Sequence, residues 1–170
     1  MNPVILIWLI LLTPLVGFGV GMTLGRKQNA VVGLITTGFS GLALVTALAL
    51  LFNNSRPQTH HWVFDWFSFG SMPVRFGFLA DPLTLMMLVL VNFIALLVQL
   101  FSQDYMHDDP DKYRYFSFLQ LFVFSMLGIV LTDNLFVMYA FWELVGLSSY
   151  LLIGFGIRKQ QRYRRLKRHF

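Results

Sequence analysis

The segment that most constrains the fold is residues 134–156, a run of 23 residues that is almost wholly apolar. As an α-helix it would be about 34 Å long, enough to cross the roughly 30 Å hydrocarbon core of a bilayer. Glu143 is the tenth residue of this run and would lie near the middle of the membrane. An acidic side chain at that depth costs roughly 2.5–3.5 kcal/mol to insert, so we expect it to face protein or water and to have a function.

The residues around Glu143 predict that its face of the helix contacts protein. Tyr139, Ala140, Gly146 and Leu147 lie one helical turn away on either side. Gly146 and Ala140 would allow a second helix to approach closely, and Tyr139 could donate a hydrogen bond. Two interpretations remain open at this point. Glu143 is either a proton-carrying or ion-pairing carboxylate, or a structural carboxylate fixed by a hydrogen bond to a neighbouring helix.

The composition is that of an integral membrane protein. Of the 170 residues, 56% are hydrophobic and 12% are charged, about half the charged fraction of a soluble domain. The chain has no cysteine, which excludes disulfides, cysteine-ligated iron–sulfur clusters and a thiol nucleophile within it. The net charge of +5 arises from the tail, because residues 158–170 carry seven of the 13 Lys and Arg and no acid.

The helical boundaries are predicted from apolar runs and from capping residues. Asn2 and Asp81 are expected to be N-caps, with Pro3 and Pro82 as the residues that follow. Asp133 is most simply the N-cap of the last helix. The five predicted membrane helices lie near residues 3–24, 30–52, 81–103, 114–131 and 134–156.

The segment between the second and third runs has a different period. Residues from Trp62 to Ser68 alternate in the pattern of a strand, a turn follows Gly70, and a second extended run ends at Leu79. This pattern predicts a β-hairpin at about residues 60–79, and its tryptophans suit the membrane interface. His60 and His61 are adjacent and would point to opposite faces of a strand, so we predict no metal site there. The expected fold is all-α integral membrane, with five transmembrane helices and this short interfacial hairpin.

Two polar features interrupt the apolar pattern. Asn92 and Gln99 are seven residues apart and share a helical face, which favours hydrogen bonding to other helices over a polar ion path. Residues 102–114 contain four acids, but their spacing does not match an EF-hand calcium loop. We therefore expect that segment to be a solvated connection.

The distribution of basic residues predicts the orientation. The 25–29 loop, the 102–114 loop and the tail would share one side of the membrane, with two, two and seven bases. The other side would have only Arg56 and Arg75. The positive-inside rule therefore places the N-terminus outside.

Several segments together resemble a known family. The chain resembles subunit L of bacterial NADH:quinone oxidoreductase (complex I), the family that also includes chloroplast and mitochondrial chain 5, over roughly residues 1–156. The large subunit of multisubunit Na⁺/H⁺ antiporters shares much of the pattern and remains an alternative. A stand-alone membrane scaffold is a third possibility. The segments that carry the resemblance are DPLTLMM (81–87), YMHDD (105–109), LTDNL (131–135) and FWELVGLSSYLLIGF (141–155).

The resemblance implies a role for Glu143 in proton translocation. In the family, the carboxylate of the fifth helix pairs with a lysine on a broken seventh helix and modulates the proton affinity of that lysine. Tyr139, Trp142 and Gly146 would support the carboxylate. This chain has the carboxylate but no intramembrane lysine.

The resemblance also implies which cofactors and partners to expect. NADH, flavin, iron–sulfur clusters and quinone would be bound by other subunits, so we expect no cofactor and no metal on this chain. Its partners would be the other membrane subunits, the lipid bilayer and protons, and not nucleic acid. Its location would be the bacterial inner membrane.

The tail departs from the family after Phe155. Family members continue Gly-Phe-Trp, then a short polar loop, then a helix that often begins near Ala-Ala-Lys-Lys-Ala-Phe. With freely chosen codons, one base inserted after codon 155 turns the next residues into Trp-Tyr, and turns codons 164–170 into a frame reading Ala-Ala-Lys-Lys-Ala-Phe. Our hypothesis is that residues 156–170 are out of frame. The alternative is a genuine basic stop-transfer tail that binds anionic lipid.

Overall fold

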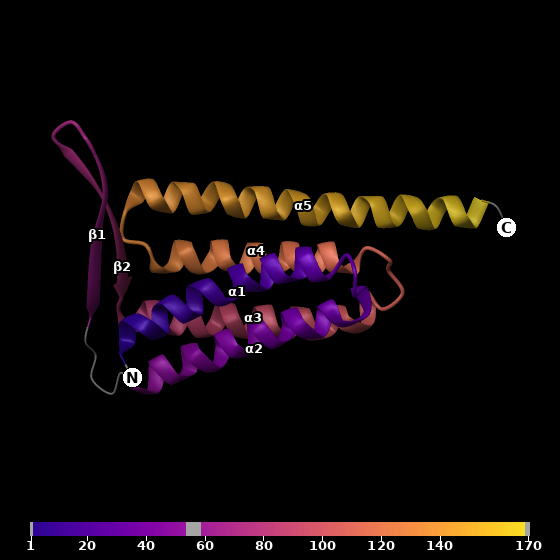
Figure 1. Cartoon of the computed structure of the whole chain (residues 1–170), viewed down its shortest axis with the longest axis horizontal. Helices are drawn as coiled ribbons and strands as arrows, with labels where there is room; N and C mark the ends of the chain where they lie inside the picture. The colour runs from indigo at the N-terminus through magenta and orange to yellow at the C-terminus, as the bar shows by residue number, and fades with distance from the viewer. Residues whose placement is uncertain (1, 54–58, 169–170) are drawn as a thin grey trace.

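The computed structural model describes residues 2–53 and 59–168. In these residues four helices form a bundle, a fifth and longer helix lies alongside the fourth, and a two-stranded hairpin lies across one end (Figure 1). The N-terminus is at the hairpin end, and the last helix extends beyond the bundle at the opposite end. The elements are α1 (Pro3–Leu24), α2 (Asn29–Asn53), β1 (His60–Phe69), β2 (Met72–Ala80), α3 (Pro82–Tyr105), α4 (Lys112–Leu131) and α5 (Leu135–Arg168).

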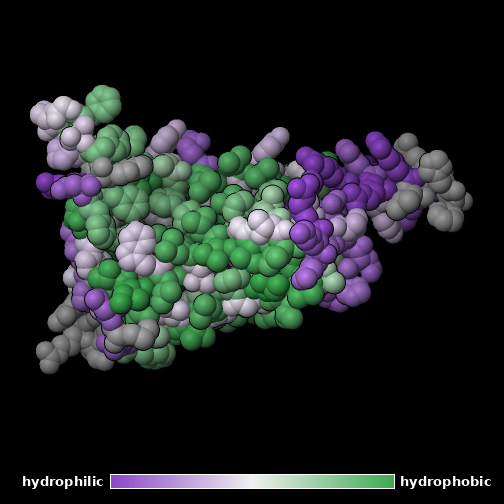
Figure 2. Space-filling view, in the orientation of Figure 1, coloured by the Kyte–Doolittle hydropathy of each residue, from purple (hydrophilic) through white to green (hydrophobic). Residues whose placement is uncertain are grey.

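All five helices are long and apolar enough to cross a membrane. The face of the bundle that Figure 2 shows is correspondingly hydrophobic, and hydrophilic side chains gather at the far end of α5 and the loop beside it. The predicted fold class is therefore confirmed: the chain is a multi-pass membrane protein with a small antiparallel sheet between the second and third helices.

Two of the three predicted helix caps are present. The Asn2 side chain accepts a hydrogen bond from the Val4 N–H at 3.1 Å, and the Asp81 carboxylate accepts one from the Thr84 N–H at 2.7 Å. Each cap satisfies a backbone donor that the first helical turn leaves without a partner. These bonds fix the starts of α1 and α3 where the sequence predicted them.

The cap predicted at Asp133 is wrong. Asn134 directly precedes α5, and its side-chain oxygen accepts the hydrogen bond from the Phe136 N–H at 2.8 Å. Asp133 lies one residue too early, and its carboxylate contacts His61 on the hairpin instead. Both residue types cap helices well, so sequence preference alone did not distinguish them.

The last helix does not end near residue 156 as predicted but continues to Arg168. Residues 157–168 contain no Gly or Pro and are mostly Arg, Lys, Gln and Leu, which are good helix formers. Basic side chains in the last turns also interact favourably with the negative end of the helix dipole. At 34 residues, α5 is about 51 Å long, so it extends well beyond a bilayer core of about 30 Å.

The hairpin forms as predicted and packs on the ends of the helices. β1 and β2 are antiparallel, with a register shift between Asp65 and Phe67, and Gly70 in the turn has φ +62°. Phe78 of β2 is almost fully buried and its ring meets the Trp8 ring edge-on at 5.2 Å. The hydrophobic core therefore includes the hairpin as well as the inner faces of α1 to α4.

Candidate functional site

The four residues predicted around the carboxylate site lie on one face of α5. α5 packs on α4 through its opposite face, where the Phe141 ring meets the Phe124 ring at 5.6 Å. Glu143 is exposed, as are Tyr139 (62%) and Trp142 (67%), and a side chain at Gly146 would meet open space. Within the described residues, nothing covers this face.

The chemistry of this face is that of a carboxylate with one neighbouring hydroxyl. Tyr139 lies one turn before Glu143, and its hydroxyl interacts with the carboxylate. A helix packed on this face could approach closely at Gly146, because glycine leaves room for a neighbouring backbone. A carboxylate in such a contact can pair with a cation or accept a proton, as in the functional interpretation of Glu143, or can be fixed by a hydrogen bond, as in the structural one.

A second polar cluster is buried where α2, α3 and α4 meet. The Gln99 amide donates to the Ser40 hydroxyl at 2.7 Å. The Gln120 amide donates to the Thr36 carbonyl at 2.6 Å and to the Ser40 hydroxyl at 3.1 Å. All four residues are at most 1% exposed. Gln99 therefore faces other helices, as predicted, and the cluster connects three helices by hydrogen bonds that lipid cannot supply.

Asn92 behaves differently from Gln99. Its amide donates to the Leu88 carbonyl of its own helix at 2.8 Å. It is buried but, among the described residues, makes no hydrogen bond to another helix. Its side-chain oxygen has no hydrogen-bond partner in the described part of the chain, and neither do the amide oxygens of Gln99 and Gln120. No continuous path of polar contacts connects these residues to Glu143 in the described structure.

The two adjacent histidines point to opposite faces of β1, as predicted. His60 stacks on Trp62, with ring centroids 5.3 Å apart. The His61 ring nitrogen contacts the Asp133 carboxylate in the connection between α4 and α5. The backbone reinforces this link, since the Asp133 N–H donates to the Gly77 carbonyl at 3.2 Å. In residues 2–53 and 59–168, no three metal-ligating side chains cluster together.

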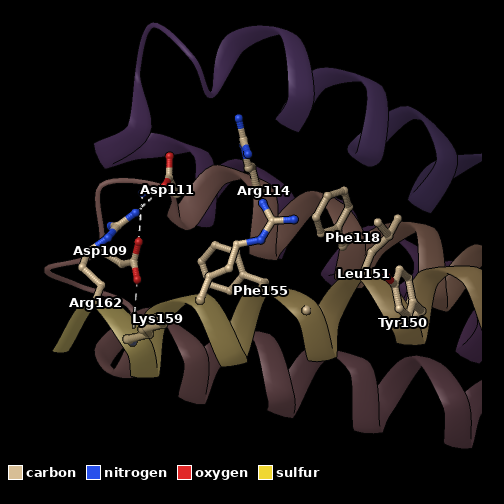
Figure 3. Close-up of a pocket in the computed structure, with 11 residues that line it drawn as sticks. Asp109, Asp111, Arg114, Phe118, Tyr150, Leu151, Phe155, Lys159 and Arg162 are labelled. Carbon is tan, nitrogen blue, oxygen red and sulfur yellow. Dashed lines mark hydrogen bonds and ion pairs between the residues drawn. The ribbon is translucent and has the colours of Figure 1, made fainter. Parts of the chain in front are cut away.

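A groove between α4 and α5 opens near the end from which α5 projects (Figure 3). It encloses about 230 Å³. Asp111 and Arg162 lie at one end of it, and Phe118, Leu151 and Tyr150 lie toward the other. The sequence does not predict this groove, because its charged residues come from two helices and a loop.

The loop between α3 and α4 and the first residue of α4 are less exposed than the predicted solvated connection. Asp109 and Lys112 are buried. The Asn29 side chain donates to the Asp109 carbonyl at 3.1 Å, and the Lys112 ammonium donates to the Ala30 carbonyl at 3.3 Å. These contacts tie the loop to the start of α2, which explains why two charged residues are buried at the end of the bundle.

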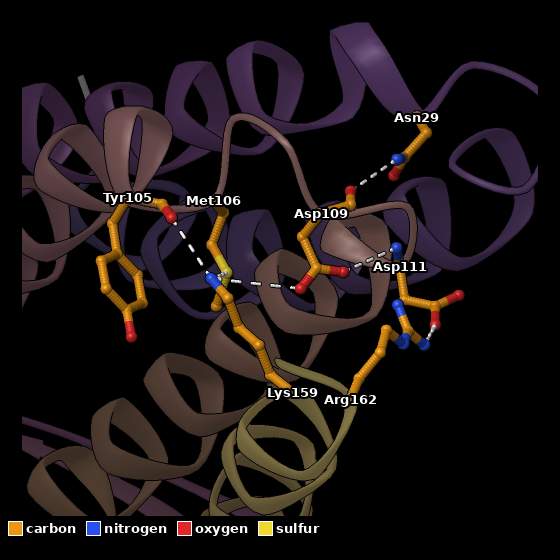
Figure 4. Close-up of polar contacts among 7 residues, drawn as sticks. All are labelled: Asn29, Tyr105, Met106, Asp109, Asp111, Lys159 and Arg162. Carbon is orange, nitrogen blue, oxygen red and sulfur yellow. Dashed lines mark hydrogen bonds and ion pairs between the residues drawn. The ribbon is translucent and has the colours of Figure 1, made fainter. Parts of the chain in front are cut away.

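The basic end of α5 is tied to the same loop (Figure 4). The Lys159 ammonium donates to the Tyr105 carbonyl at 3.3 Å and lies 4.0 Å from the Asp109 carboxylate. The Arg162 guanidinium donates to the Asp111 carboxylate at 3.0 Å. Two of the tail's bases are therefore paired with loop acids, so the tail is a docked helical extension in this structure.

Comparisons with known proteins agree with the predicted resemblance. The family model described as NADH-Ubiquinone oxidoreductase (complex I), chain 5 N-terminus, matches residues 66–116. The chain is 38% identical over 157 residues to chloroplastic NAD(P)H-quinone oxidoreductase subunit 5 of Mesostigma viride, covering 87% of this chain and 24% of that protein. It is 35% identical over 164 residues to NADH-quinone oxidoreductase subunit L of Neisseria meningitidis, covering 94% of this chain and 24% of that protein.

A solved structure is also similar. A chain in the structure of the Mrp complex from Dietzia sp. DQ12-45-1b superposes with a TM-score of 0.68 at 26% identity, covering 85% of this chain and 16% of that one. The chain thus spans about a quarter of the length of the curated relatives named above. The predicted resemblance is confirmed: over most of its length, the chain is similar to the N-terminal part of complex I chain 5 and subunit L.

Proposed function

We propose that the chain is the N-terminal part of the proton-translocating membrane subunit L of NADH:quinone oxidoreductase. It would contribute to proton pumping coupled to electron transfer from NADH to quinone, as a subunit of the enzyme and without redox chemistry of its own. NADH, flavin, iron–sulfur clusters and quinone would be bound by other subunits. The relatives named as subunits of these oxidoreductases support this proposal.

The observation that carries the proposal is the position of Glu143. It is an acid within an apolar membrane helix, on the face that the described residues leave uncovered. Retaining an acid at that depth is costly unless the acid is paired or functional. We infer that a further helix, bearing the lysine that the resemblance implies, packs on this face and pairs with Glu143.

The proposed setting is the bacterial inner membrane with the N-terminus outside. The 25–29 loop, the loop between α3 and α4 and the end of α5, which together carry most of the bases, lie at the same end of the bundle in Figure 1, opposite the hairpin. The positive-inside rule would place that end in the cytoplasm. The other membrane subunits, lipid and protons would be the partners.

A second candidate function is that of the large subunit of a multisubunit Na⁺/H⁺ antiporter. The similarity to a chain of the Mrp complex favours it. This candidate would have no redox partner. The genes that neighbour this one distinguish the two, because redox subunits would accompany a complex I subunit and small antiporter subunits would accompany the alternative.

A chimera tests the proposal directly. Residues 1–155 would replace the matching segment of the Neisseria meningitidis subunit L in a strain that lacks the subunit. We expect assembly and NADH-driven proton pumping to be restored. If the chimera fails, and the equivalent chimera with the Mrp chain restores antiport, the alternative is correct.

Residues 1–170 expressed alone in proteoliposomes should not translocate protons, because this segment provides no lysine partner for Glu143. A proton flux above that of empty vesicles, abolished by Glu143→Gln, would show that five helices suffice. The out-of-frame hypothesis for residues 156–170 also remains a proposal. Genomic DNA across codons 150–175 tests it, and an intact frame would make the basic tail native.

A further inference from the structure

The groove between α4 and α5 changes from charged to apolar along the helix axis. Arg114 lies one turn before Phe118 on α4, and Arg158 lies one turn after Gly154 on α5. Further into the membrane the lining is Phe118, Tyr150 and Leu151. Figure 3 shows this order, with Arg114 between the acidic end and the apolar end. The groove therefore joins the level of the lipid headgroups to the hydrocarbon core.

The charges at the mouth of the groove are unbalanced. Four cations and two carboxylates line it. Both carboxylates have partners, because Arg162 donates to Asp111 at 3.0 Å and Lys159 lies 4.0 Å from Asp109. The Asp109 carboxylate also accepts a hydrogen bond from the Asp111 N–H at 2.9 Å. The acids are therefore neutralised by the other two bases, and the remaining charge belongs to Arg114 and Arg158.

Neither of these two arginines forms a salt bridge in residues 2–53 and 59–168, although the Asp111 carboxylate also interacts electrostatically with Arg114. Arg114 donates one hydrogen bond to the Tyr113 hydroxyl at 3.0 Å, and its guanidinium lies 5.7 Å from the Tyr113 ring. Arg158 makes no hydrogen bond or ion pair within the described structure, and its side chain is exposed. A guanidinium near a membrane surface attracts phosphate, which it can bind with two parallel hydrogen bonds.

The neighbouring cavity on the other side of α5 provides a contrast. Its lining includes Asp104 and Asp108, in addition to Asp109. Its additional acids would repel an anionic group. Charge complementarity therefore favours the α4–α5 groove, and the adjacent apolar lining favours an anion that also has a hydrocarbon chain.

We propose that the α4–α5 groove binds one phospholipid with an anionic headgroup. Its phosphate contacts Arg158 and Arg114, and one acyl chain lies along Phe118, Leu151 and Tyr150. The lipid fills the groove next to the helix that carries Glu143 and holds α5 against α4 at that end. This proposal requires that the chain spans a membrane and that residues 156–170 are native, because Arg158 lies among them, so it is an alternative to the out-of-frame hypothesis. It does not depend on the rest of the proposed function.

The test is lipid binding to the 170-residue chain purified in a non-ionic detergent, measured by native mass spectrometry. The probes are dioctanoyl phosphatidylglycerol, dioctanoyl phosphatidylcholine and glycerol 1-phosphate. We expect one molecule of phosphatidylglycerol to bind more tightly than either of the others. Tight binding of phosphatidylcholine would overturn the anionic requirement. Equal binding of glycerol 1-phosphate would show that the site binds a free phosphate group and would overturn the assignment of a lipid.

Matched charge variants locate the site. Each basic residue near a membrane contributes roughly fivefold to the binding of anionic lipid, so Arg114→Gln with Arg158→Gln should weaken phosphatidylglycerol binding about tenfold or more. The control, Arg164→Gln with Lys167→Gln, removes the same charge about 9 and 14 Å further along α5, roughly a Debye length or more away. It should weaken binding less than about threefold. Equal losses in the two double variants would show diffuse attraction to the tail and refute the site.

A third variant leaves every charge in place and so remains informative if the arginine variants fail to fold. A side chain at Gly154 would meet no atom within 4 Å, so Gly154→Leu should fold and occupy the groove beside its apolar lining. Gly146→Leu adds the same side chain at another open position on α5, outside the groove. We expect Gly154→Leu to abolish binding of the single phosphatidylglycerol and Gly146→Leu to retain it. Retained binding in Gly154→Leu would overturn the proposal.

Discussion

Adding a single methyl group at Gly128 should displace α5 from α4. A Cβ atom at this position would lie within 2.6 Å of three carbon atoms of the Phe141 ring, closer than real Cβ contacts allow. The ring cannot move freely, because it packs against the Phe124 ring at 5.6 Å with an interplanar angle of 68°. The overlap is therefore relieved by moving the helix that carries Glu143, and not by a change of rotamer alone.

Overpacking of this kind typically costs 1–3 kcal/mol, and we expect about 2 kcal/mol for Gly128→Ala. That corresponds to a factor of about 30 in the equilibrium between the packed and unpacked states. Gly146→Ala is the matched control, since it adds the same methyl group to α5 where no atom lies within 4 Å. Alanine is favoured over glycine in a helix by about 1 kcal/mol, so Gly146→Ala should be at least as stable as the wild type.

Equilibrium unfolding in mixed detergent micelles measures the free energy of unfolding of both variants. Combining Phe141→Leu with Gly128→Ala then tests whether the Phe141 ring causes the effect. Leucine removes the outer ring atoms, so Phe141→Leu should cost about 1 kcal/mol in the wild type and should stabilise the Gly128→Ala background. If Gly128→Ala is as stable as Gly146→Ala, the contact between α4 and α5 is wrong. If Phe141→Leu costs the same in both backgrounds, the overlap with this ring is not the cause.

Three further predictions follow from other parts of the structure. Single cysteines introduced into this cysteine-free chain should report its orientation in the membrane. A cysteine at Ser68 should react with an impermeant label added from outside, and a cysteine at Asp108 should not. The reverse result would invert the topology. Asp133→Asn retains the side-chain shape but loses the charge that faces His61, so we expect faster proteolysis of the hairpin in this variant; equal rates would show that the pair contributes nothing. The hydrogen bond from the Thr84 N–H lowers the pKa of Asp81. The charged Asp81 cap therefore stabilises the fold fully above the unfolded-state pKa of about 4, and this stabilisation is lost as pH falls through the lower folded-state pKa. Asp81→Asn, which cannot titrate, should therefore be less stable than the wild type at pH 7, and the gap should shrink toward pH 3; a gap that does not change with pH would contradict this assignment.

The features that the sequence predicted well depend on local rules. The caps at Asn2 and Asp81 were predictable because each residue lies directly before a proline that begins an apolar run. The hairpin was predictable because an alternating strand-like pattern of side chains begins after the second helix and stops at Gly70. The shared face of Asn92 and Gln99 follows from helical periodicity alone, which says that both are buried but not which atoms they contact.

The features that the sequence did not predict depend on contacts between distant segments. His61 and Asp133 are 72 residues apart, and only the folded chain brings the hairpin to the end of α4. The length of α5 was underestimated because the resemblance ends near residue 156, although the residues that follow favour helix. The open face around Glu143 has a similar origin: the sequence predicted a face that contacts protein, and the described residues contain no element that covers it.

The central claim is that Glu143 takes part in proton translocation, and proton pumping per electron measures it most directly. In the chimera of residues 1–155 with the Neisseria meningitidis subunit, Glu143→Gln keeps the side-chain shape and removes the charge. Asp65→Asn is the matched control, an exposed acid on the hairpin paired with Arg75. We predict that Glu143→Gln assembles normally but pumps fewer protons per NADH oxidised, while Asp65→Asn pumps as the unsubstituted chimera does. An unchanged ratio in Glu143→Gln would show that the carboxylate is structural and would contradict the account.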